Sequence, residues 1–157
     1  DVLGSRGLGD VYKRQAQELM ANGTHFMNPH GLHDDNHYTT AYDLYLIFNE
    51  CIKHEDFVNI IQSEAYTAHY TDVDGNSQEA LFTPTNLYAQ GEVDVPENVT
   101  IVGGKTGTTD EAGYCLILME KDSSDNPYIS IVMGASEKPV LYEDMTSLIE
   151  AIPSGQQ

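Results

Sequence analysis

Basic residues are scarce in this 157-residue sequence. Lysine and arginine together number 7 against 25 aspartates and glutamates, which gives a formal net charge of -18 at pH 7. Proteins that bind nucleic acid place clustered Lys and Arg opposite phosphates. The absence of any basic patch therefore excludes nucleic acid as a partner. The acidic residues are spread over many short loops, which indicates a solvated surface.

Tryptophan is absent, and the two cysteines, Cys51 and Cys115, show neither C-x-x-C nor metal-ligand spacing. Because both lie in apolar segments, we expect buried free thiols. No apolar run approaches the roughly 18 residues that a membrane span needs, and no secretion signal opens the chain. The composition, 40% hydrophobic and 20% charged, suits one globular domain or a piece of one.

The first fifteen residues, DVLGSRGLGDVYKRQ, differ in character from the rest of the chain. They hold three of the basic residues, lack an initiator Met and have no amphipathic period. We interpret residues 1–15 as a non-native tail or adaptor scar, and residues 16–157 as the folded part.

Helical patterns dominate the first half of the folded part. Residues 16–21 read as the last turn of a helix that ends at Asn22-Gly23. Thr40 and Asp43 resemble a capping box that starts a helix to about His54, and a shorter helix over 55–63 would bury Phe57, Ile60 and Ile61. A hairpin over 65–71 and 79–83 turns near Asp74-Gly75.

The second half reads as a surface connection followed by a sheet and a helix. Residues 84–98 contain Pro and Gly among acidic residues. The strand-like runs are 99–109, 113–121 and 127–135, and the middle one is apolar without alternation, as in a strand covered on both faces. A final helix repeats Leu141, Met145 and Ile152 at helical spacing, with Glu143 and Asp144 in its first turn. The order predicts an α+β fold with an antiparallel sheet and flanking helices.

The sharpest chemical feature is the run Gly103-Gly104-Lys105-Thr106-Gly107-Thr108-Thr109 on a predicted strand. Small residues along a strand edge let an extended ligand pair closely with the backbone. A lysine beside several hydroxyls would form a local site for a carboxylate.

Three stretches, THFMNPHGL, HYTTAYDL and GGKTGTTDEAGYCLI, resemble in this order the serine D-alanyl-D-alanine carboxypeptidases of the penicillin-binding superfamily. The resemblance covers roughly residues 16–152. It implies part of the β-lactamase/penicillin-binding transpeptidase-like fold, with the N-terminal part missing. The implied enzyme removes the terminal D-alanine of peptidoglycan stem peptides through an acyl-serine that β-lactams also acylate. It also implies a place in the bacterial cell envelope and no cofactor.

The resemblance gives roles to four residues. Lys105 resembles the catalytic KTG lysine, which polarises the site and helps to place the substrate carboxylate. Thr106 and Thr108 would offer hydroxyls to that carboxylate, and Gly107 would leave room for the substrate. The backbone N–H of Thr108 would be one of two oxyanion-hole donors. His25, Asn28 and His30 would belong to a supporting loop near the site.

The nucleophile that this chemistry needs is not found in the sequence. The family carries it in an S-x-x-K motif, with an S-x-N motif between it and KTG. No lysine here has a serine three positions before it. Ser124-Asp125-Asn126 spells S-x-N but comes after KTG in a predicted hairpin turn, so we interpret it as a coincidence. We therefore expect this chain alone to be inactive.

Three alternatives stay open. A class A β-lactamase-like enzyme or a D,D-endopeptidase would share the fold. A non-catalytic acidic module would instead bind a peptide or a metal, with His25, His30, His33 and His37 as candidate ligands. Their spacing matches no established zinc pattern, so we assign no metal site.

Overall fold

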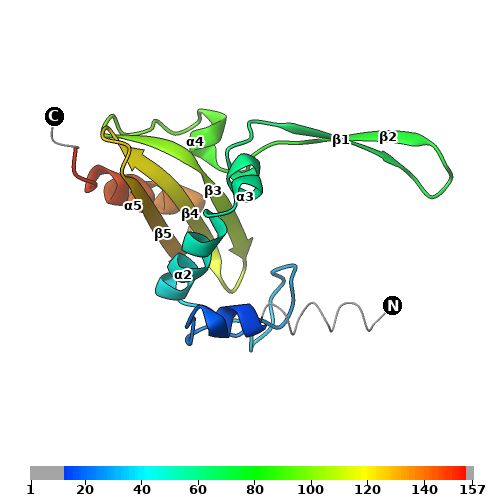
Figure 1. Ribbon diagram of the computed structural model, residues 1–157, viewed down its shortest axis with the longest axis horizontal. Helices are drawn as coiled ribbons and strands as arrows, with labels where there is room; N and C mark the ends of the chain where they lie inside the picture. Colours follow the sequence, from blue (N-terminus) through cyan, green and yellow to red (C-terminus); the bar gives the residue numbers. More distant parts are fainter. Residues whose placement is uncertain (1–12, 155–157) are drawn as a thin grey trace.

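A computed structural model describes residues 13–154 of the chain, and its helices and strands follow one another in groups, as expected for an α+β fold (Figure 1). Residues 13–18 are helical. The named elements are α2 (Ala41–Cys51), α3 (Glu55–Ile61), β1 (Tyr66–Thr71), β2 (Ser77–Phe82), α4 (Leu87–Gln90), β3 (Val99–Thr109), β4 (Gly113–Asp122), β5 (Pro127–Ala135) and α5 (Lys138–Glu150).

The three predicted strand runs form one antiparallel sheet in the order β3-β4-β5. The β4–β5 turn is held by Asp122, whose carboxylate accepts hydrogen bonds from the backbone N–H groups of Ser124 and Asn126 at 2.8 and 2.9 Å. Ser124-Asp125-Asn126 therefore lies in a hairpin turn, as predicted.

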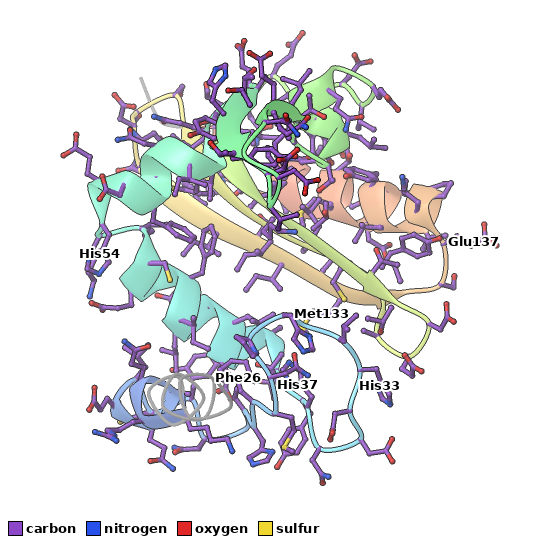
Figure 2. All side chains as sticks on the ribbon, turned by 90° about the vertical axis from the view of Figure 1, so that its right-hand side faces the viewer. Phe26, His33, His37, His54, Met133 and Glu137 are labelled. Atoms are coloured by element: carbon purple, nitrogen blue, oxygen red, sulfur yellow. The ribbon has the colours of Figure 1, made fainter. Side chains whose placement is uncertain are left out.

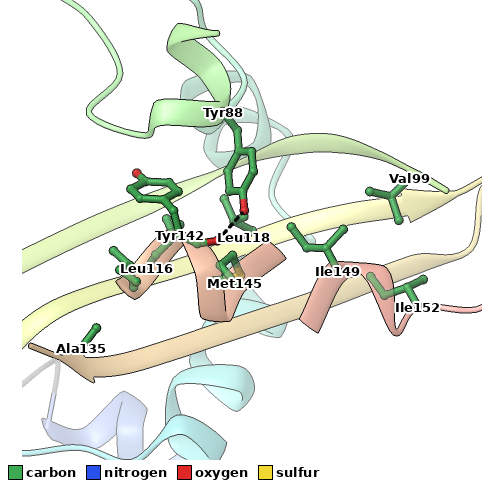
Figure 3. Packing of buried hydrophobic residues seen from close by; sticks show 10 residues of the cluster. Tyr88, Val99, Leu116, Leu118, Ala135, Tyr142, Met145, Ile149 and Ile152 are labelled. Atoms are coloured by element: carbon green, nitrogen blue, oxygen red, sulfur yellow. Dashed lines mark hydrogen bonds between the residues drawn. The ribbon is translucent and has the colours of Figure 1, made fainter. Parts of the chain in front are cut away.

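The core lies between this sheet and α5 (Figure 3). Leu116 and Leu118 of β4 are buried against Met145 and Ile149 of α5, each at most 1% exposed. Every second residue of β4 points to this face, whereas Cys115, Ile117 and Met119 on the other face are only half-buried. Helices α2 and α5 both pack against the sheet, so cover on both faces is found as expected, but the packing against α5 is closer than the packing on the α2 side. Figure 2 shows α2 and α5 on different sides of the sheet.

The final helix begins earlier than expected. Pro139 stands in its first turn, a position where the fixed φ and missing N–H of proline suit a helix start, so α5 begins at Lys138. Glu143 and Asp144 consequently lie in the second turn, and the predicted place for them in the first turn was wrong.

The predicted cap of α2 is confirmed, since the Thr40 hydroxyl accepts a hydrogen bond from the backbone N–H of Asp43 at 3.1 Å. The Asp43 side chain is buried and accepts a bond from the Thr24 hydroxyl at 2.7 Å. Gly23 is needed here for space, because a Cβ on it would lie 2.9 Å from the Thr40 methyl group. The preceding helix ends instead at Met20, which takes the left-handed conformation (φ 59°) predicted for the glycine.

Three burial predictions also need correction. Ile60 of α3 is 73% exposed, while Phe57 packs edge-on against Phe48 of α2. The segment 84–98 is not all surface, since it carries α4 and buries Tyr88 beside Tyr142 of α5. Cys51 and Cys115 are free thiols as expected, but half-buried rather than buried.

The predicted β1–β2 hairpin is confirmed, and it projects away from the rest of the molecule (Figure 1). Gly75 stands in its turn with a φ of 85°, a conformation that glycine adopts without strain. Interpretations that concern residues 1–12 lie outside the described residues.

Candidate functional site

The Lys105–Thr108 run lies in the second half of β3, which is an edge strand. Lys105 pairs with Ile117 and Thr108 with Tyr114 of β4, and no other strand in residues 13–154 pairs with β3. An edge strand presents backbone N–H and C=O groups to which an extended ligand can add. The described residues thus leave a strand edge open beside the predicted lysine.

The glycines of this strand serve two different purposes. A Cβ on Gly103 would lie 2.2 Å from the carbonyl oxygen of Ile61, so this glycine admits the end of α3 against the strand. A Cβ on Gly104 would meet the carbonyl of Ile117 at 2.1 Å. At Gly107, by contrast, nothing lies within 4 Å of the position that a Cβ would take. Of these three glycines, Gly107 is therefore the one that faces open space.

Lys105 is exposed, and its ammonium nitrogen donates a hydrogen bond to the carbonyl oxygen of Thr106 at 2.6 Å. In the part of the chain that the structure describes, no carboxylate forms an ion pair with it. An ammonium has three donors, so two remain for a ligand. This positive charge therefore has no ion-pair partner among the described residues of a strongly acidic chain.

Thr106 and Thr108 differ in their surroundings. The Thr106 hydroxyl is half-buried and hydrogen-bonded to the hydroxyl of Thr85, from the segment between β2 and α4. The Thr108 side chain is exposed and makes no hydrogen bond with another described residue. The sequence held no signal for Thr85, because 21 residues separate it from Thr106 and only the fold brings the two hydroxyls together.

The 24–40 loop reaches the turn that comes after the strand. His33 Nδ1 lies 3.7 Å from the Glu111 carboxylate between β3 and β4. Within the loop, the Asn28 side chain accepts a bond from the N–H of Gly31, and His25 Nδ1 lies 2.6 Å from the Asn36 carbonyl. His30 Nδ1 accepts from the N–H of Leu32. These side chains organise the loop, as expected for a supporting role. Residues 13–154 contain no group of three or more metal-ligating side chains.

Two hollows lie away from the strand. One of about 370 Å³ lies between residues 15–19 and α2 and is lined by Phe26, Ile47 and Cys51. Burial, with a smaller contribution from Glu50, raises the pKa of the Cys51 thiol, which makes it a poor nucleophile. The other, of about 520 Å³, is lined by acidic residues including Asp94 and Glu150. Neither involves Lys105, so the candidate site is an exposed strand edge.

Comparison with known proteins gives consistent matches. The sequence profile of the D-alanyl-D-alanine carboxypeptidase family matches residues 9–137. The chain is 28% identical to D-alanyl-D-alanine carboxypeptidase DacF of Bacillus subtilis over 87% of its own length and 32% of that protein. It is 28% identical to DacA of Haemophilus influenzae over 80% of its length and 28% of that protein.

A solved structure of a point mutant of a Streptomyces DD-transpeptidase shares the fold, with a TM-score of 0.81 at 23% identity over 93% of this chain and 54% of that one. The chain spans about a third of the length of the curated relatives that it matches. The family profile begins at residue 9, inside the segment interpreted above as a tail. Since that profile covers most of the sequence, the chain belongs to the D-alanyl-D-alanine carboxypeptidase family, peptidase S11.

Proposed function

We propose that this chain forms the substrate-binding side of a serine D-alanyl-D-alanine carboxypeptidase, which trims the terminal D-alanine of peptidoglycan stem peptides and is acylated by β-lactams. The observation that carries the proposal is the edge of β3 that stays open in residues 13–154, with the exposed Lys105, which has no ion pair among these residues, beside the open position at Gly107. A peptide ending in a carboxylate fits such an edge, because its backbone can pair with the strand while the charge meets the ammonium.

Each residue of the strand takes part in a different contact. Lys105 attracts the terminal carboxylate of the substrate and polarises the site. The Thr108 hydroxyl has no hydrogen-bond partner within residues 13–154 and offers a hydrogen bond to that carboxylate. The Thr106 hydroxyl is hydrogen-bonded to the Thr85 hydroxyl, and because a hydroxyl has one donor and two acceptor sites it can form a further bond to the ligand. Gly107 leaves room for the substrate backbone, and the Thr108 N–H is one oxyanion-hole donor.

The acylation step needs a nucleophilic serine three positions before a lysine, and this sequence has no serine at that spacing. In the family reaction a serine hydroxyl attacks the carbonyl of the penultimate D-alanine, D-alanine leaves as the amine, and water hydrolyses the ester. Since no serine precedes a lysine by three positions, the chain can bind and polarise but cannot form the ester.

This function places the whole protein in the bacterial cell envelope, where its stem-peptide substrate is found. In residues 13–154 no helix is long and apolar enough to cross a membrane.

A fluorescent penicillin tests the reaction. We expect no covalent labelling of the 157-residue chain, and labelling of a version extended upstream in its reading frame to include an S-x-x-K serine. Labelling of the short chain would show that it holds a nucleophile of its own. Hydrolysis of penicillin faster than of stem peptide by the extended protein would favour the β-lactamase-like alternative.

Binding by the short chain is tested separately. Titration with a peptide ending in D-Ala-D-Ala should shift the backbone NMR signals of Thr106, Gly107 and Thr108. Lys105→Ala should weaken this binding roughly tenfold or more, because a charge-assisted hydrogen bond contributes about 1.5–3 kcal/mol. Lys121→Ala on the neighbouring strand is the matched control, since Lys121 is ion-paired with Asp125 in the β4–β5 turn. Equal loss in both variants would contradict a specific role for Lys105.

A further inference from the structure

The β1–β2 hairpin carries large apolar side chains that nothing in the described structure covers. Tyr66, Tyr70 and Phe82 are 66%, 52% and 59% exposed. Neither strand makes extensive contacts with another described helix or strand, and the hairpin projects into solvent (Figure 1). Exposed apolar groups that gather on one surface indicate an interaction site more often than scattered ones do.

The strand register places the three rings on one face. Tyr66 pairs with Phe82 and Ala68 with Ala80, while Tyr70 pairs with Gln78 at the far end. Residues directly opposite in an antiparallel pair point to the same side of the sheet. We call this the aromatic face. Its rings lie at the two ends of the hairpin, separated by four residues of strand or about 13 Å. The small side chains of the two alanines between them form a shallow floor.

The opposite face of the hairpin is more polar. It carries Thr67, Thr71 and Ser77, and His69 lies 3.1 Å from the Glu79 carboxylate. Leu81 is its large apolar residue and is 68% exposed. The tyrosine and phenylalanine rings thus lie on one face of the hairpin, as expected where that face alone binds a ligand.

The turn holds the projecting strands in shape. The Asp72 carboxylate accepts four hydrogen bonds, from the backbone N–H groups of Asp74 and Asn76 and from the side chains of Asn76 and Gln78, at 2.8–3.3 Å. A surface that is ordered before binding loses less entropy on binding. The aromatic face is therefore preorganised although it lies outside the core.

Charge narrows the class of partner. The chain has a net charge of -18, to which the hairpin contributes Asp72, Asp74 and Glu79 and no lysine or arginine. An anionic membrane or a second copy of this chain would be repelled. An uncharged polymer with apolar C–H surfaces would not be repelled by this charge. Sugar rings present such surfaces to aromatic side chains while their hydroxyls stay in water.

The base of the hairpin is continuous with the candidate site. Phe82 is followed by Thr83, Pro84 and Thr85, and the Thr85 hydroxyl is bonded to that of Thr106 on β3. A polymer that lies along the aromatic face consequently ends near the strand edge that would receive a stem peptide.

We propose that the aromatic face of the β1–β2 hairpin binds the glycan backbone of peptidoglycan and so positions a stem peptide beside Lys105. The choice of this glycan rests on the proposed function, whereas binding of a sugar polymer by the face does not need the catalytic reaction. Rings stack on the C–H faces of successive sugars, and the alanine floor lets the chain of sugars lie flat between them.

The test uses the 157-residue chain and purified glycan strands from which an amidase has removed all stem peptides, at about 0.5 M salt, because the amidase frees a carboxylate on every second sugar and salt screens its repulsion from the acidic chain. We expect the chain to co-sediment with these strands, and the triple variant Tyr66→Ala, Tyr70→Ala, Phe82→Ala to bind roughly tenfold more weakly, since each ring contributes an aromatic contact. Leu81→Ala on the opposite face is the matched control and should bind as the original chain does. Circular dichroism of all variants checks that the fold is kept.

The outcomes separate this proposal from the proposed function. The hairpin proposal is overturned if peptide-free strands bind the triple variant as tightly as the original chain, or if they bind neither protein. This holds even if a D-Ala-D-Ala peptide still shifts the NMR signals of Thr106–Thr108. Loss of a dimer in the triple variant, seen by analytical ultracentrifugation, would instead assign the face to self-association. Binding of peptide-free strands without any D-Ala-D-Ala binding would support the hairpin proposal and contradict the role of Lys105.

Discussion

The β3–β5 sheet with α5 and the β1–β2 hairpin are both antiparallel β structures, yet they are stabilised in different ways. In the sheet, Leu118 is completely buried between β4 and α5. In the hairpin, Leu81 is 68% exposed and the order comes from the bonds around Asp72. One region is held by apolar burial and the other by turn chemistry.

This difference separates stability from recognition in the molecule. A two-stranded ribbon is marginal on its own in water, because it buries little apolar surface. Its exposed rings add nothing to the core, so they can change without unfolding the domain. The sheet, in contrast, fixes the position of Lys105 through its pairing with Ile117, and damage to its core would disturb the site.

The largest difference in stability should appear when a leucine is replaced by alanine in each region. Leu118→Ala removes a fully buried side chain from the α5 interface and should lower the free energy of unfolding by about 3 kcal/mol. Leu81→Ala should change it by less than about 0.5 kcal/mol, as is usual for exposed positions. Urea titration followed by circular dichroism measures both.

An equal loss in the two variants would contradict the distinction between the regions. Leu118→Met is the conservative control, because it nearly keeps the volume and should cost less than about 1.5 kcal/mol.

Between about pH 5 and 8, a pH dependence of stability should come from the sheet. Glu120 is completely buried on the α5 side of β4, and neither carboxyl oxygen has a hydrogen-bond partner in the described residues. Burial raises its pKa to about 7, against a smaller opposing influence from nearby Ser130. The native state thus keeps this proton to a higher pH than the unfolded chain does. Stability should therefore fall as the pH rises from about 5 to 8, by on the order of 2 kcal/mol.

Glu120→Gln isolates this contribution, since it keeps the shape without the titrating proton. Unfolding midpoints of the original chain and the variant should differ more at pH 8 than at pH 5, with the variant the more stable at pH 8. Parallel pH profiles for the two proteins would show that Glu120 does not titrate in this range.

The sequence predicted much of this fold where local patterns were strong. The three strand runs, the hairpin near Gly75 and the Thr40 cap all depend on residues close together in the chain. The predictions that failed depended on packing at a distance. Tyr88 is buried because α5 returns beside α4, and Ile60 is exposed because α3 meets β3 through Ile61 rather than through that side chain.

The candidate site divides in the same way. Lys105, Thr106, Gly107 and Thr108 could be selected from a short motif and its resemblance to a family. Neither the hydroxyl pair of Thr85 and Thr106 nor the contact of His33 with Glu111 could be selected, because each joins elements whose approach is decided by the whole fold.

The smallest effect on global stability should come from the turn of the hairpin. Asp72→Ala removes the four hydrogen bonds that this carboxylate accepts. The amides of β1 and β2 should then exchange with solvent faster, while those of β3, β4 and α5 and the urea midpoint stay unchanged, because local opening does not expose the core. Asp74→Ala is the matched control, since the Asp74 side chain accepts no hydrogen bond from a described residue. Hydrogen exchange resolved by residue measures both, and faster exchange in β4 of the Asp72 variant would mean that the hairpin and the sheet unfold as one unit.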